Sequence, residues 1–272
     1  MSFRALVHED DLGENLPPLR KFHLAGFDID KEKFIKDVEE TFADLPEDQY
    51  DKIRKQSEYI ARIVRHRIKT IQEGLLSGGA AATEFMNVLS PAQREEYVAI
   101  RASRFRRIAK YEVDVSGRNR SIERVPTGAY TQYNLPEGDP RAVPRTFEEA
   151  LPEIAEHPDL QRLLIALALE VKKVRKKTKM TMVLHQVRMD APYTLPDRTH
   201  RDGCQFIVSA IPIIMEQAKG ALSSVYDSQR KLLLRTQLQK GEGLFFDDEY
   251  YLHGISQLHT GKRGTIGIDI NY

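Results

Sequence analysis

MTMVLHQVRM, residues 180–189, is the first of a series of short, apolar-rich segments that we interpret as strands. Turns rich in Gly, Asp and Lys separate the segments, and strands at this spacing predict a β-sandwich or jelly roll. The later segments are CQFIVSAIPII (204–214), ALSSVYD (221–227), KLLLRTQL (231–238), EGLFFDD (242–248) and GTIGIDINY (264–272).

The chain before these strands is mainly helical. Phe34, Val38 and Phe42 recur at helical spacing, and isoleucines form a stripe along a long basic helix over 52–76. Ser90 precedes a proline and is expected to cap one more helix. Because one face of the 52–76 helix is apolar and the other charged, that helix can pack on the protein or form a homodimer interface.

After the helices the period of the pattern changes. RFRRIAKYEVDV (104–115) alternates like a strand, and a long helix is expected near 146–177. We predict an α+β fold: a double-stranded β-helix (jelly roll, cupin-like) with a helical N-terminal half packed on it. The chain is expected to be a single domain, 1–272, with a mainly helical region at 1–100 and a jelly-roll catalytic core at 101–272.

Composition excludes several classes of protein. The 272 residues carry 41 basic and 40 acidic side chains, so no overall charge draws the protein to nucleic acid or to an anionic membrane. The one cysteine, Cys204, cannot form an internal disulfide. The N-terminus is too polar for a signal peptide, and no apolar run is long enough to cross a bilayer. These features predict a cytoplasmic protein.

THRDGCQF, residues 199–206, carries the first chemical signal. His200 and Asp202 are two apart, so in a strand they point to the same side and can grip one metal ion. A second histidine from another strand would complete a two-histidine, one-carboxylate face, which leaves positions open on Fe(II). Taken alone, the motif is better explained as a charged turn, because His and Asp are common in loops.

The C-terminal segment supplies the missing groups. His253 follows an apolar strand and comes 53 residues after His200 (253 − 200). We expect His253 as the third ligand, because His259 lies only four residues before Arg263, in what we interpret as a turn before the last strand. Arg263 and Thr265 share a face of that strand, and an arginine with a hydroxyl makes a good carboxylate clamp. The spacing suits a small acid such as 2-oxoglutarate, bound by metal at one end and by arginine at the other.

These residues resemble the Fe(II)/2-oxoglutarate-dependent dioxygenases. HQVRMDAPYTLPDRTHRDGCQFIVSAIPI (185–213), GLFFDDEYYLHGISQL (243–258) and RGTIGIDINY (263–272) resemble the bacterial branch that includes L-isoleucine 4-hydroxylase and related free amino-acid hydroxylases. The resemblance extends over roughly residues 95 to 272. The segment MEQAKGALSSVYD (215–227) departs from that branch, which usually has a basic turn with Asn and two Gly there.

The resemblance implies a function and the residues that perform it. His200, Asp202 and His253 would hold Fe(II), and Arg263 with Thr265 would hold the far carboxylate of 2-oxoglutarate. With O₂, the enzyme would decarboxylate 2-oxoglutarate to succinate and hydroxylate an unactivated C–H of a free L-amino acid or a small amino-acid derivative. The departure at the site mouth predicts a substrate different from isoleucine.

Five further residues are candidates for substrate binding: Gln132, Asn134, Arg145, His185 and Arg188. An amino acid requires a cation for its carboxylate, and Arg145 or Arg188 offers one. Solvated loop residues and a buried structural histidine are the alternatives for these positions.

Two other functions stay open at this point. Basic clusters such as KKVRKKTKM (172–180) would let the enzyme hydroxylate a macromolecule, a peptide or RNA, although the balanced charge argues against nucleic acid. A non-oxidative cupin-type binding protein would share the fold, but it would not require Arg263 at its distance from His253.

Overall fold

The computed structural model describes residues 4–5, 17–65, 67–132, 135, 143–194 and 199–272. Its contacts divide the chain into two compact units. Unit 1 combines Met1–Leu45 with Arg106–Tyr272, and unit 2 is the intervening segment Pro46–Phe105. The single domain expected from the sequence stays a prediction, and most of the helices of the N-terminal half belong to unit 2.

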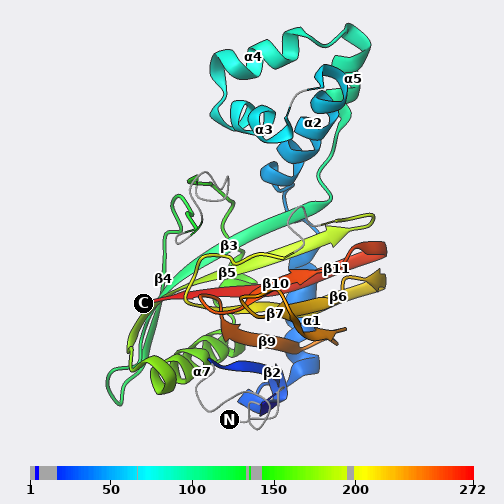
Figure 1. Ribbon diagram of the computed structural model, residues 1–272. Helices are drawn as coiled ribbons and strands as arrows, with labels where there is room; N and C mark the ends of the chain where they lie inside the picture. The colour runs from blue at the N-terminus through cyan, green and yellow to red at the C-terminus, as the bar shows by residue number, and fades with distance from the viewer. Residues whose placement is uncertain (1–3, 6–16, 66, 133–134, 136–142, 195–198) are drawn as a thin grey trace. The chain divides into compact units, whose positions relative to one another are not determined.

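Unit 1 is built on an eight-stranded sheet in the order β1-β2-β9-β6-β11-β5-β3-β4 (Figure 1). The central neighbours β9, β6, β11 and β5 run antiparallel to one another. The strands are β1 (Arg4–Ala5), β2 (Leu19–His23), β3 (Arg104–Asp114), β4 (Ser121–Val125), β5 (Lys179–Asp190), β6 (Phe206–Gly220), β9 (Glu242–Asp247) and β11 (Leu258–Asn271).

A second, three-stranded sheet packs on the first. It has the order β10-β7-β8 and consists of β7 (Ser223–Tyr226), β8 (Leu232–Thr236) and β10 (Leu252–Ile255). Val225 of β7 packs in one buried cluster with Ile207 of β6 and Phe246 of β9. Two antiparallel sheets that share an apolar core form a jelly roll, so the predicted α+β fold class is confirmed.

Unit 1 also contains helical elements: η1 (Leu24–Phe27), α1 (Lys31–Glu39), η2 (Glu40–Phe42), α6 (Pro152–Ala155) and α7 (Pro158–Arg175). Ion pairs join α7 to strand β2, through Arg20 and Glu170 at 3.0 Å, and to the end of β9, through Arg175 and Asp247. No helix in the described ranges is long and apolar enough to cross a membrane.

The helix expected near 146–177 is shorter than predicted. Its start at Pro158 follows from the residue type, because proline lacks the N–H that a helix interior requires. The segment before it is extended, and there Ala150 N–H donates to the Ile108 carbonyl of β3 at 2.7 Å. The sequence pattern therefore merged an extended segment and two helices into one.

Unit 2 is a bundle of short helices with its own apolar core of Ile60, Ile71 and Leu89. The long helix expected over 52–76 is broken at Arg65, whose φ of 54° ends one helix before the next begins. The Ser90 cap is confirmed. The helices are α2 (Gln49–Val64), α3 (Ile68–Ser77), α4 (Gly79–Asn87) and α5 (Pro91–Ala99).

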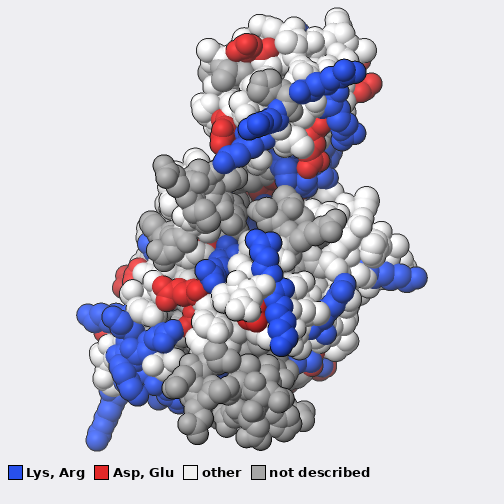
Figure 2. Space-filling model, in the orientation of Figure 1, with Lys and Arg blue, Asp and Glu red and all other residues white. Residues whose placement is uncertain are grey.

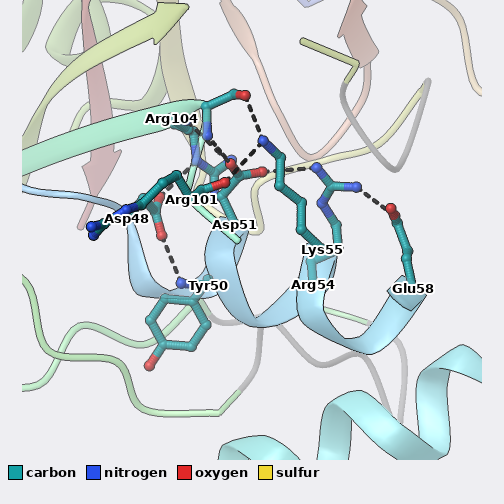
Figure 3. Close-up of polar contacts among 9 residues, drawn as sticks. Asp48, Tyr50, Asp51, Arg54, Lys55, Glu58, Arg101 and Arg104 are labelled. Carbon is teal, nitrogen blue, oxygen red and sulfur yellow. Dashed lines mark hydrogen bonds and ion pairs between the residues drawn. The ribbon is translucent and has the colours of Figure 1, made fainter. Parts of the chain in front are cut away.

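Two buried aspartates at the start of α2 tie together the two ends of unit 2 (Figure 3). Asp51 accepts hydrogen bonds from the backbone N–H groups of Ser103 and Arg104, at 2.7 and 3.1 Å, and pairs with Arg54. Asp48 caps α2 and accepts from Arg104 Nε at 2.6 Å. The chain that enters unit 2 is thereby held to the chain that leaves it.

Four strands lie where the sequence pattern indicated none: β1, β2, β4 and β10. The turn expected around His259 is wrong, because β11 already begins at Leu258. Register shifts in the β11–β6 pairing, with Gly261 at φ 75°, let the strand pass through a segment whose composition indicated a turn.

Candidate active site

His200 and His253 are brought together by the backbone. They form an isolated antiparallel bridge in which each N–H donates to the carbonyl of the other, at 2.9 and 2.8 Å. Residues directly opposite on antiparallel segments place their side chains on the same face. The ring centroids accordingly lie 4.6 Å apart.

Asp202 places its carboxylate between the two rings. Its Oδ1 lies 3.5 Å from His200 Nε2, and its Oδ2 lies 3.3 Å from His253 Nε2. One ligand atom from each of the three residues falls within 4.8 Å of the others, close enough for a single metal ion. His259, the competing candidate, lies exposed on β11 and is not part of this cluster.

A second carboxylate, that of Asp248, supports the cluster. Its Oδ2 accepts from the backbone N–H groups of Asp202 and Gly203, at 2.9 and 2.8 Å. Its Oδ1 lies 3.5 Å from His253 Nδ1, so His253 turns Nε2 towards Asp202. Gly203 has a φ of 80°, which a glycine adopts without strain and which directs these N–H groups to one carboxylate.

The electrostatics of the metal-free cluster are dominated by the two histidines and the carboxylates. Burial by itself would raise the pKa of Asp202, but His200 and His253 hold it well below its usual value. Burial would likewise lower the pKa of His253, yet Asp202 and Asp248 raise it to about 10. The metal-free site therefore keeps a proton on His253 at neutral pH, and a metal ion must displace it.

Arg263 is a buried cation on β11. Its side chain is 1% exposed, and burial lowers its pKa to about 10, so it stays charged at neutral pH. Within the described ranges its Nε and Nη2 make no hydrogen bond. Thr265 is buried two residues along the same strand. A buried guanidinium with unsatisfied N–H groups is costly unless an anion binds there.

The register of β5 against β11 separates two of the other candidates. His185 lies opposite Gly267, on the face that also carries Arg263 and Thr265, whereas Arg188 lies opposite Gly264 and points to the other face. Arg188 accordingly donates to the backbone carbonyls of Phe42 and Ala43. The structure does not bring Arg188 together with the histidine cluster.

His185 belongs to a buried group. Its Nε2 lies 3.0 Å from Asp269 Oδ2, an oxygen that also accepts from the Tyr130 hydroxyl. Burial and the neighbouring Asp269 raise the pKa of Tyr130 well above its usual value, so this hydroxyl is a donor. His185 Nδ1 is buried and makes no hydrogen bond to any part of the chain that the structure describes.

Gln132 reaches the metal cluster itself, and Arg145 contacts Gln132. Gln132 Nε2 donates to Asp202 Oδ1 at 3.1 Å, and Arg145 donates to the amide oxygen of Gln132. Both side chains are buried. Asn134, the fifth candidate for substrate binding, lies outside the described residues.

The donor set fits the cofactors expected from the sequence. Two imidazoles and one carboxylate match the face that non-haem Fe(II) takes. The unsatisfied N–H groups of Arg263 match the far carboxylate of a small diacid, since a planar guanidinium can bind both carboxylate oxygens.

Comparison with known proteins agrees with this fold. A bsmA homolog from Methylobium petroleophilum PM1 is similar at 22% identity over 62% of this chain and 71% of its own, with a TM-score of 0.54. IDO from Bacillus thuringiensis is similar at 16% identity over 62% of this chain and 75% of its own, with a TM-score of 0.50. Likeness at these identities shows a shared fold. No curated protein matches the chain.

The sequence pattern of one family covers well over half of the chain. The model for the 2OG-Fe dioxygenases matches residues 89–268, a range that contains His200, Asp202, His253 and Arg263. Because this range takes in both sides of the histidine bridge and most of the strand that carries the buried arginine, we conclude that the chain belongs to the 2OG-Fe dioxygenase family.

Proposed function

We propose that this enzyme hydroxylates an unactivated C–H of a free L-amino acid or a small amino-acid derivative. Members of its family use Fe(II), 2-oxoglutarate and O₂. The observation that carries the proposal is that the chain offers both a three-residue metal cluster and Arg263, a buried cation that makes no ion pair within the described ranges. The two sites suit the two ends of one small diacid.

Each residue has a distinct part in this proposal. His200, Asp202 and His253 hold Fe(II), which with 2-oxoglutarate supplies the activation of O₂. Arg263 binds the far carboxylate through parallel hydrogen bonds, and Thr265 adds a hydroxyl on the same face. Asp248 keeps His253 Nε2 directed at the metal.

The proposed substrate class rests on the resemblance of residues 185–213 and 243–272 to the free amino-acid hydroxylases. His185 adds a feature of its own, because its buried Nδ1 lies on the same face of the sheet as Arg263 and Thr265. We propose that His185 faces the substrate and that Asp269 fixes its ring. Because 215–227 departs from the branch, we expect a substrate other than isoleucine.

A macromolecular substrate is the main alternative. On the face drawn in Figure 2, Lys and Arg side chains lie among Asp and Glu side chains, as the 41 basic and 40 acidic residues would suggest. Binders of nucleic acid usually carry a continuous basic surface, so a small substrate is the better proposal. A non-oxidative binding protein would not require a buried cation at Arg263, and burying an unpaired charge destabilises the fold.

Succinate release tests the proposal. Protein loaded with Fe(II) without oxygen is given 2-oxoglutarate and O₂, with each of the twenty L-amino acids in turn. Turnover stimulated by one or a few of them, with one oxygen added to that amino acid, is the expected result. Slow succinate release that no amino acid stimulates would contradict the substrate class, and failure to bind both metal and 2-oxoglutarate would contradict the function.

A further inference from the structure

Gln132 lies between the metal-site carboxylate and a buried arginine. Its amide nitrogen is 3.1 Å from Asp202 Oδ1, and its amide oxygen accepts from Arg145. We propose that Arg145 is a positioning residue that acts through Gln132 to make Asp202 a one-oxygen ligand. The inference rests on the proposed function, and it assigns Gln132 and Arg145 a role different from the substrate binding that the sequence suggested.

The chemistry of the three groups permits one arrangement of the amide. A guanidinium only donates hydrogen bonds, and an ionised carboxylate only accepts them. Gln132 must therefore turn its oxygen to Arg145 and its NH₂ group to Asp202. The contacts agree with this orientation, because Gln132 Nε2 lies 3.1 Å from Asp202 Oδ1 and Arg145 Nη2 donates to Gln132 Oε1. Without Arg145 the amide would lose the partner that fixes this orientation.

Arg145 is itself held rigidly. Its side chain is 6% exposed, and its guanidinium carbon lies 5.3 Å from the ring centre of Tyr130 and 5.8 Å from that of Phe147. The backbone of Arg145 also pairs with that of Tyr130 through two hydrogen bonds, of 2.7 and 2.8 Å. The Tyr130 hydroxyl donates to Asp269 on β11. A framework of this kind fixes where the end of Gln132 lies.

The consequence concerns how Asp202 presents its oxygens. The Gln132 amide occupies Oδ1, which leaves Oδ2, the oxygen nearer His253 Nε2, to bind the metal. A carboxylate that binds through one oxygen takes one coordination position, whereas one that binds through both takes two. The two-histidine, one-carboxylate face works only if the opposite positions stay open for the cosubstrate and O₂. Gln132 and Arg145 would keep them open.

Binding of Co²⁺ to the metal-free protein, without 2-oxoglutarate or substrate, tests the proposal apart from turnover. We compare Gln132→Met, Arg145→Met and the double variant, and record the visible Co²⁺ spectrum together with the dissociation constant. Loss of such supporting hydrogen bonds weakens metal binding about 10- to 100-fold. We expect a loss in this range for Gln132→Met, a changed spectrum, and no further loss in the double variant, because Arg145 acts only through Gln132.

Arg124→Gln is the matched control. Arg124 pairs with Glu149, and Glu149 accepts a hydrogen bond from the Thr127 N–H, five residues before Gln132. Arg124 itself makes no hydrogen bond to Gln132. The Arg124→Gln substitution should therefore leave the Co²⁺ spectrum and affinity unchanged. Arg145→Lys, which keeps a donor, should recover part of the affinity. If Arg145→Met fails to fold, Gln132→Met alone carries the test.

The outcomes separate the inference from the proposed function. Unchanged Co²⁺ binding in both single variants, with a higher amino-acid requirement in turnover, would make Gln132 and Arg145 substrate anchors and overturn the inference alone. Equal and additive losses in the two single variants would also overturn it. A wild-type protein that binds neither Co²⁺ nor 2-oxoglutarate would overturn the proposed function and the inference with it.

Discussion

His200 and His253 hold each other in place, because each backbone N–H donates to the carbonyl of the other across a single antiparallel bridge. The metal cluster thus forms only when the segment before β6 meets β10. Each histidine is fixed by backbone pairing, and the Asp202 carboxylate is fixed by its neighbours. The backbone pairing of these two segments therefore sets the spacing of the two rings.

Replacing a residue of the cluster should abolish metal binding. His200→Ala, Asp202→Ala and His253→Ala each remove one of three ligand atoms, and we expect a larger loss of Co²⁺ affinity than the about 100-fold that a lost supporting hydrogen bond costs. Succinate formation should disappear with it. His259→Ala is the control, since His259 is exposed on β11. Loss of activity in His259→Ala with full activity in His253→Ala would show that the third ligand is misassigned.

Arg263→Met should weaken 2-oxoglutarate binding and yet stabilise the ligand-free protein. Removing one partner of a buried charge pair costs about 2 to 5 kcal/mol, so the dissociation constant measured by calorimetry should rise about 30-fold or more. Without 2-oxoglutarate, the substitution removes a buried charge that makes no ion pair within the described ranges. The unfolding temperature should then stay level or rise.

Arg188→Met is the matched control for Arg263. It lies on the neighbouring strand but points to the other face, where it donates to the backbone carbonyls of Phe42 and Ala43. Its loss should lower the unfolding temperature and leave 2-oxoglutarate affinity unchanged. Weaker 2-oxoglutarate binding in Arg188→Met, with unchanged binding in Arg263→Met, would show that 2-oxoglutarate binds on the Arg188 face of the sheet and would contradict our proposal.

Metal binding should release a proton and grow stronger as the pH rises. Burial would lower the pKa of His253, but Asp202 and Asp248 raise it to about 10, against about 6.5 in the unfolded chain. The raised pKa stabilises the metal-free protein fully below about pH 6.5, and this contribution is lost as the pH rises towards about 10. We expect about one proton released per Co²⁺ at pH 8, detected with an indicator dye.

The raised pKa of His253 also predicts how the stability of the metal-free protein changes with pH. Its unfolding temperature should fall between pH 7 and pH 10 because of His253, and His253→Gln should remove that part of the slope. A metal-free protein whose stability shows no His253-dependent slope, and which binds Co²⁺ without proton release, would contradict the raised pKa.

Asp51→Ala should destabilise unit 2. The substitution leaves the N–H groups of Ser103 and Arg104 without their buried acceptor and Arg54 without one partner (Figure 3). Removing one side of a buried charged network costs about 3 to 5 kcal/mol. Hydrogen exchange across 46–105 should accelerate, while exchange in β6 and β11 stays unchanged.

Glu58→Ala is the control for Asp51, because Glu58 pairs with the same Arg54 from a position that is 36% exposed. An exposed pair contributes about 0 to 1 kcal/mol, so exchange should hardly change. Equal effects of the two substitutions would show that the buried aspartate does not hold the ends of unit 2 together.

The sequence by itself determined most of the strands and indicated the candidate metal ligands. The segments 180–189 and 204–214 are short, rich in apolar residues and bounded by turn residues, which is typical of buried strands and depends only on each segment's own residues. The sequence likewise predicted that His200 lies beside Asp202 and Arg263 beside Thr265. Residues two apart in a strand share a face, whichever strand lies next to it. These local rules do not depend on the rest of the fold.

Only the tertiary structure decided which other side chains these residues contact. Only the register of β5 against β11 turns His185 towards the face of Arg263 and Arg188 away from it, because a shift of one residue exchanges the faces. Asp248 and Gln132 reach Asp202 from 46 and 70 residues away along the chain, distances at which no local pattern operates. The left-handed Arg65 that splits the basic helix could not be predicted either, since helix propensity in this segment favours an unbroken helix.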